Sequence, residues 1–128
     1  MVFGLGSGNF SVAITKPLLV SGDDLVLNVN TGAGGVVRVE ILNATDDPIP
    51  LFSDSTRDRG AFPYGDPLMN HPIPVVANSI AKTVQWHTLT KVGAKEVWQQ
   101  YGLKTLRGQM VKLRFLMVGT KLYSYSFV

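Results

Sequence analysis

Apolar and polar side chains alternate with a period of two through most of this chain. The clearest runs lie at residues 10–15, 25–30, 36–41, 80–86, 111–117 and 122–127. Because successive side chains of a β-strand point to opposite faces, each run predicts a strand with one buried face. Turn-forming clusters separate the runs, and no strand–helix–strand alternation appears. The pattern therefore predicts an all-β fold, an antiparallel β-sandwich of the jelly-roll or lectin-like type.

Two pairs of neighbouring runs are joined by short glycine-containing turns. Residues 31–35, with the sequence TGAGG, separate the runs at 25–30 and 36–41. Residues 118–120, with the sequence VGT, separate the runs at 111–117 and 122–127. Glycine adopts positive φ at no steric cost, so such turns are typical of hairpins. We therefore expect each pair of runs to form a hairpin.

Two segments depart from the period of two. Residues 53–78 contain four prolines and two glycines and show no periodicity, and a connection of this length in a compact domain is often functional. The second segment is 88–105. Within it, Val92, Val97, Trp98 and Tyr101 have the spacing of one helical face, which predicts a short helix near 93–101.

Composition narrows the class of protein. The 128 residues suit a single domain, 1–128, and 45% of them are hydrophobic while 16% are charged. The chain has no cysteine, which excludes disulfides and thiol catalysis. The net charge of +3 is scattered and forms no basic stripe, so we expect no nucleic-acid partner. No apolar run reaches roughly 18 residues and the first residues lack the features of a signal peptide, so we expect no membrane span.

Four phrases of the sequence resemble one family. They are TKPLLVSGDDLVLNVNTGAGGVVRVEILNATDDPIPLFS, SIAKTVQW, LKTLRGQMVKLRF and KLYSYSF, which together span most of the chain from Thr15 to Phe127. They resemble the C-terminal β-sandwich accessory module of glycoside hydrolase family 32-like and sialidase-like proteins, whose catalytic part is a five-bladed propeller. The resemblance implies a sandwich fold and carries no catalytic motif. This sequence departs from the family by two enlarged segments, 53–78 and 88–105, and by Leu51, which stands where the family pattern has glycine.

The residues indicate no catalytic constellation, so we expect no enzymatic activity from this chain. Most acidic residues lie in turn-forming sequence, and the nucleophile elbow of serine hydrolases is absent. His71 and His87 have no metal-ligand spacing. The pairs Asp23-Asp24 and Asp46-Asp47 are either structural calcium ligands or ordinary turn residues, and turn statistics favour the second interpretation. We therefore expect no cofactor.

Aromatic residues in the enlarged segments make carbohydrate binding the leading hypothesis, since aromatic faces stack on the apolar faces of sugars while polar neighbours bind hydroxyls. The candidate site residues are Phe62, Tyr64, Trp98 and Tyr101, together with Arg57, Asp58, Arg59 and Gln99. Trp98 and Tyr101 could instead anchor their own segment to the core. Trp86, Tyr123, Tyr125 and Phe127 fall in predicted strands, where we expect core or hairpin packing.

Three functional hypotheses remain open at this point, and the least supported is a self-contained glycosidase that uses two of Asp54, Asp58, Asp66 and Glu96. The first is a non-catalytic carbohydrate-binding or accessory module, extracellular or at the cell surface, whose partner is a polysaccharide or glycan. The second is a structural or assembly module that uses segment 53–78 and the C-terminal strands for protein contacts and forms an oligomer.

Overall fold

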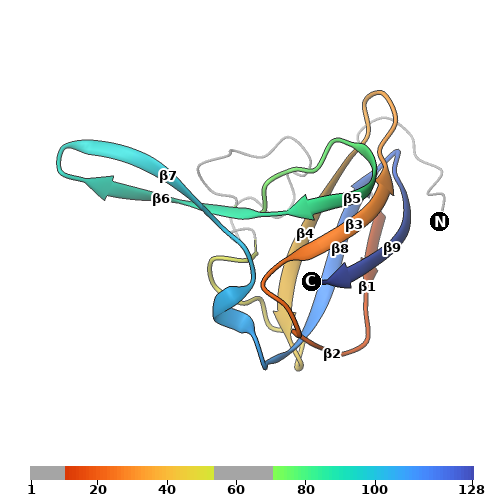
Figure 1. Cartoon of the computed structure of the whole chain (residues 1–128), viewed down its shortest axis with the longest axis horizontal. Helices are drawn as coiled ribbons and strands as arrows, with labels where there is room; N and C mark the ends of the chain where they lie inside the picture. The colour runs from red at the N-terminus through yellow and green to blue at the C-terminus, as the bar shows by residue number, and fades with distance from the viewer. Residues whose placement is uncertain (1–10, 54–70) are drawn as a thin grey trace.

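The computed structural model describes residues 11–53 and 71–128, and these form two antiparallel sheets packed face to face with a projecting hairpin (Figure 1). The all-β prediction is confirmed. No helix in the described ranges has the length and apolar character needed to cross a membrane. The strands are β1 (Ser11–Ile14), β2 (Leu18–Leu19), β3 (Leu25–Asn30), β4 (Val36–Asn43), β5 (Asn78–Val84), β6 (Trp86–Val92), β7 (Lys95–Tyr101), β8 (Met110–Val118) and β9 (Lys121–Phe127), and a 3₁₀ turn η3 (Lys104–Leu106) precedes β8.

The first sheet is built around β8. Strand β4 pairs with β8 along its whole length on one side, and β1 and β2 follow one another along the other side. Pro17 lies between β1 and β2. Proline has no N–H to donate, which accounts for the interruption of the ladder at this point. The second sheet has β3 at its centre, with β5 and β9 at its edges.

The core lies between the two sheets and is formed by alternate residues of the central strands. Leu25 and Leu27 of β3 face Val39 of β4 and Leu113 of β8, and all four are fully buried. Each contributes about 1.5–3 kcal/mol relative to an exposed side chain of the same type. The period of two thus correctly predicts which side chains of β3 are buried. It is wrong for β4, because the outward-facing Arg38 and Glu40 are buried as well as Val37, Val39 and Ile41.

The two predicted hairpins are wrong. β3 pairs with β5 and β9, while β4 pairs with β8, so the turn at 31–35 carries the chain from one sheet to the other. The turn at Gly119 does the same between β8 and β9. The two crossings lie against each other, because a Cβ on Gly35 would overlap the Thr31 carbonyl oxygen and would lie 2.8 Å from the Gly119 carbonyl oxygen. Alternation identifies strands but does not identify their partners.

The predicted aromatic positions of the framework are mostly confirmed. Trp86 is fully buried, and its Nε1–H donates a hydrogen bond to the Val39 carbonyl oxygen at 2.8 Å. Phe127 packs on the core and Tyr125 contacts the Phe115 ring. Tyr123 is the exception, because 63% of it is exposed on edge strand β9.

Strand β1 buries the face that its sequence does not suggest. Val12 and Ile14 are exposed, and Ala13 packs against the core. The register explains this, since Ala13 lies opposite Phe115 on the inner face while Val12 lies opposite Leu116 on the outer face. That outer face also holds a buried ion pair, in which Arg114 Nε donates to Glu40 Oε1 at 2.6 Å.

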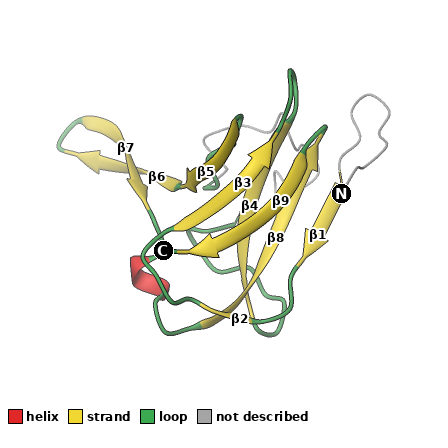
Figure 2. Ribbon diagram, turned by 45° about the vertical axis from the view of Figure 1, so that its right-hand side comes forward, coloured by secondary structure: helices red, strands yellow, loops and turns green. Residues whose placement is uncertain are grey.

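The predicted helix near 93–101 is wrong, because these residues belong to a β-hairpin. β6 and β7 pair from Trp86–Tyr101 at the base to Val92–Lys95 at the tip. Gly93, at φ 66°, and Ala94 form the two-residue turn, and a glycine at the first position suits the primed turns that match strand twist. The hairpin extends away from both sheets (Figures 1 and 2).

Candidate functional site

The β6–β7 hairpin sorts the candidate residues onto two faces. Its register places Thr88 opposite Gln99 and Leu89 opposite Trp98. Because side chains alternate along a strand, Gln99 and Tyr101 share one face, and Trp98 lies on the other. A helix would have placed positions 98 and 101 on the same side. The structure therefore separates Trp98 from Gln99 and Tyr101.

A pocket of about 250 Å³ lies at the base of the hairpin, on the Gln99 face. Three segments that are distant in sequence form it: residues 51–52, the two hairpin strands, and the stretch from 102 to 105 that leads into and includes part of η3. The lining residues are Leu51, Phe52, Thr88, Gln99, Tyr101, Gly102, Lys104 and Thr105. We call this the hairpin-base pocket.

Tyr101 joins the hairpin-base pocket to the core. Its ring packs edge-on against Phe52, with centroids 5.4 Å apart, and Phe52 packs in the same manner against Trp86. The Tyr101 hydroxyl donates a hydrogen bond to the Leu51 carbonyl oxygen. Burial raises the pKa of Tyr101 to about 12, so its hydroxyl stays protonated well above neutral pH. Tyr101 is therefore held in place in the pocket by the aromatic cluster of Trp86, Phe52 and Tyr101.

The backbone at Leu51 adopts a conformation that is unusual for its residue type. Its φ is 74°, in the left-handed region, where a side chain with a Cβ is strained by about 1–2 kcal/mol. Glycine tolerates this conformation, because it has no Cβ. The hydrogen bond from Tyr101 holds the Leu51 carbonyl in its place in the pocket wall.

The polar lining is available to a ligand. The side chains of Thr88, Gln99, Lys104 and Thr105 make no hydrogen bond or ion pair with any other residue in the described part of the chain. Between them they offer hydroxyl, amide and ammonium groups beside an apolar floor of Phe52 and Tyr101. A pocket that is mainly apolar with a few polar groups is typical of small-molecule sites.

The opposite face of the hairpin presents an aromatic surface. Trp98 is 38% exposed and stacks on the His87 ring, with centroids 4.2 Å apart and the planes at 25°. The His87 backbone N–H donates to the His71 carbonyl oxygen at 2.9 Å, and His71 Nδ1 lies 3.0 Å from the His87 carbonyl oxygen. Both histidines thus have structural contacts at the base of the hairpin.

The remaining candidates of segment 53–78, Phe62, Tyr64, Arg57, Asp58 and Arg59, lie outside the described residues. Of the sequence candidates, the structure brings Gln99 and Tyr101 together in the hairpin-base pocket. Thr88, Lys104 and Thr105 were not identified from the sequence, because no motif marks them. The signal that could have found Thr88 is the Gly93-Ala94 turn, which aligns it with Gln99.

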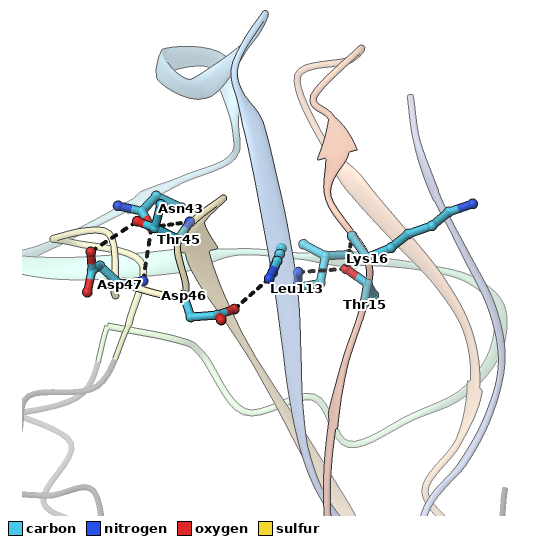
Figure 3. A network of polar contacts seen from close by, with 8 residues as sticks. Thr15, Lys16, Asn43, Thr45, Asp46, Asp47 and Leu113 are labelled. Atoms are coloured by element: carbon cyan, nitrogen blue, oxygen red, sulfur yellow. Dashed lines mark hydrogen bonds and ion pairs between the residues drawn. The ribbon is translucent and has the colours of Figure 1, made fainter.

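The acidic pairs act as turn residues. Asp46 Oδ1 accepts from Lys112 Nζ at 2.8 Å, and Asn43 Oδ1 accepts hydrogen bonds from the Thr45 and Asp47 backbone N–H groups (Figure 3). Asp23 Oδ1 lies 3.2 Å from Arg107 Nη1. Among residues 11–53 and 71–128, no group of three His, Asp or Glu side chains has the geometry to hold a metal ion.

Comparison with protein-family models, with curated proteins and with solved structures gives no match to this chain. The resemblance to glycoside hydrolase accessory modules therefore stays a prediction. What can be inferred about function comes from the hairpin and its pocket.

Proposed function

We propose that this chain is a non-catalytic carbohydrate-binding module, extracellular or at the cell surface, and that the hairpin-base pocket holds the glycan. The observation that carries the proposal is a group of four polar side chains around the floor of Phe52 and Tyr101, none of which has a partner among the described residues. A pyranose ring presents C–H groups on its faces and hydroxyls at its rim. An aromatic floor with hydroxyl and amide groups at the wall complements both.

The lining supports binding over hydrolysis. Glycoside hydrolysis requires two carboxyl groups flanking the scissile bond, separated by about 5–9.5 Å. Among the described residues that line the hairpin-base pocket, none is an aspartate or a glutamate. A sugar bound there would meet a single charged side chain, Lys104, and no general acid from these residues.

Affinity electrophoresis through gels that contain a panel of polysaccharides tests the proposal. We expect at least one polysaccharide to retard the protein, and we expect Gln99→Ala to weaken that retardation about fivefold, since it removes a hydrogen-bonding group from the pocket. Gln100→Ala is the matched control, because Gln100 is the adjacent residue on β7 and lies on the opposite face. Absence of retardation by every polysaccharide, or equal effects of the two substitutions, would overturn the proposal.

A second candidate function is assembly through the outer part of the hairpin. An isolated two-stranded hairpin is marginally stable in water, and this one exposes Val92, Val97 and Trp98. A protein partner that covers these side chains would stabilise it. Analytical ultracentrifugation distinguishes the two functions: an oligomer that Trp98→Ser dissociates supports assembly, whereas a monomer at all concentrations excludes self-assembly.

A further inference from the structure

We propose that the hairpin-base pocket selects a sugar that carries a carboxylate, such as a uronic acid, and that Lys104 binds this group. The inference rests on the proposed function and adds the class of ligand. Lys104 belongs to η3, and Leu103 and Leu106 on either side of it are buried. The Leu103 N–H donates to the Asp23 carbonyl oxygen at 2.6 Å. The backbone that carries Lys104 is therefore fixed, although its side chain is exposed.

Charge is the first reason for an acidic ligand. Lys104 is the one charged residue among those described that line the pocket. Tyr101 adds no negative charge near neutral pH, because burial raises its pKa to about 12. An ammonium group that has no carboxylate partner in residues 11–53 and 71–128 favours an anionic ligand group, which gains a charge-assisted hydrogen bond.

The supply of hydrogen-bond donors is the second reason. The Lys104 ammonium has donors alone, while the Thr88 and Thr105 hydroxyls and the Gln99 amide each offer both a donor and an acceptor. Four of these groups thus carry donors and three carry acceptors, and the excess is the donor-only ammonium of Lys104. A carboxylate accepts several hydrogen bonds and donates none, so it complements this excess better than a neutral hydroxymethyl group does.

Two nearby aspartates limit the selectivity. Asp23 is paired with Arg107, but Asp24 Oδ1 lies where it would be 2.6 Å from a Cβ on the lining residue Gly102. The negative charge of Asp24 partly offsets the positive charge of Lys104. Solvent also screens the exposed ammonium, so we expect a preference of about tenfold for the acidic sugar rather than a larger one.

The size of the pocket limits how many sugar rings can enter it and reach Lys104. Its volume of about 250 Å³ is below the range of roughly 300–1,000 Å³ that drug-sized ligands occupy. One sugar ring can enter, and the neighbouring rings of an oligosaccharide would extend along the exposed strands of the hairpin.

Isothermal titration calorimetry with two matched probes tests the inference: tetragalacturonate and its fully methyl-esterified form, which share one sugar chain and differ in charge and in the ester methyl groups. Wild-type protein should bind the acid about tenfold more tightly than the ester. Lys104→Gln should lower the affinity for the acid about tenfold, to that of the ester, and so abolish this difference. Lys91→Gln is the control, since Lys91 is an exposed lysine of β6 near the hairpin tip and should preserve the preference.

The outcomes separate this inference from the proposed function. Equal affinities for acid and ester, or a preference that survives in Lys104→Gln, would overturn the acidic-sugar inference and leave a glycan-binding pocket. Retardation by neutral polysaccharides with no binding of tetragalacturonate would do the same. If neither probe binds and no polysaccharide retards the protein, the proposed function itself fails. Thermal melting of each variant confirms that the fold is retained.

Discussion

At the scale of single residues, Tyr101 has two roles. Its ring lines the hairpin-base pocket, and its hydroxyl bonds to the Leu51 carbonyl oxygen. Sequence alone allows two interpretations of this residue, a sugar contact or an anchor to the core. The structure provides the anchor, and the position of the ring makes it a candidate contact as well. One aromatic cluster, Trp86–Phe52–Tyr101, therefore links the core to the candidate site.

We expect the stability of the protein to depend on the ionisation of Tyr101. Its pKa is raised from 10.0 to about 12 by burial, so the folded state holds the phenol proton more tightly than the unfolded state. The resulting stabilisation is complete below pH 10 and is lost as the pH rises towards 12. Urea unfolding across this pH range should show a decline in wild type that is smaller in Tyr101→Phe. Parallel declines would contradict the assignment.

The strained backbone at position 51 gives a second prediction. Leu51 has a φ of 74° and is about half exposed, so glycine there relieves strain and loses little burial. We expect Leu51→Gly to leave the free energy of unfolding unchanged or to raise it by up to about 1 kcal/mol. The control is Leu19→Gly, since Leu19 is equally exposed but lies in β2, and we expect a loss of about 1 kcal/mol. Equal losses at the two positions, measured by urea unfolding, would refute the explanation.

The sequence predicts burial well where a strand lies at the centre of a sheet. Val29 and Leu113 lie between polar neighbours and are buried. It fails at β1, where Val12 and Ile14 are exposed. Edge strands cover less of the core, so an edge strand can place a small residue such as Ala13 inward while its larger neighbours face outward.

At the scale of elements, the hairpin shows how one apolar pattern fits two periods. Val97, Trp98 and Tyr101 lie within one helical turn of each other, and they also fit a seven-residue strand. The turn at Gly93 and the pairing with β6 show that the segment is a strand. The consequence is functional, because the strand places Trp98 on the face opposite the hairpin-base pocket.

Shortening the hairpin should separate folding from binding. We expect the protein to fold when residues 88–99 are replaced by an Asn-Gly turn, because β6 and β7 pair with each other and with neither sheet. The replacement keeps Trp86 and Tyr101, the two hairpin residues that belong to the aromatic cluster and pack against Phe52. Circular dichroism should show a cooperative melt within about 5 °C of wild type, a shift that corresponds to roughly 1 kcal/mol.

The same shortened protein should no longer be retarded by polysaccharides, since Thr88 and Gln99 are absent. Retention of glycan binding would show that the binding site lies outside the hairpin. Loss of the cooperative melt would show instead that the hairpin is required for the sandwich to fold.

At the scale of the whole molecule, the strand partners and the pocket lie beyond what the sequence pattern can predict. β3 pairs with β5 and β9, and β4 with β8, so most pairings join residues far apart in the chain. Alternation is a local signal and does not indicate which distant strands pair with each other. The hairpin-base pocket has the same origin, because Leu51, Gln99 and Lys104 meet only after the chain has folded.

The two crossings between the sheets give the last prediction. Gly35 leaves no room for a Cβ, which would overlap the Thr31 carbonyl oxygen at the point where both crossings meet. Gly93 has open space around it and a positive φ of 66°. We expect Gly35→Ala to lower the free energy of unfolding by about 3 kcal/mol or more, and Gly93→Ala by about 1 kcal/mol.

Hydrogen exchange should show where each of these two substitutions acts. Gly35→Ala forces the two sheets apart at their shared crossing, so amides of β3, β4 and β8 should exchange faster. Gly93→Ala strains a turn that only the hairpin uses, so faster exchange should be confined to β6 and β7. If Gly35→Ala changed exchange in one sheet alone, the crossings would not couple the sheets, and the stability of each sheet would have to be explained by its own pairing.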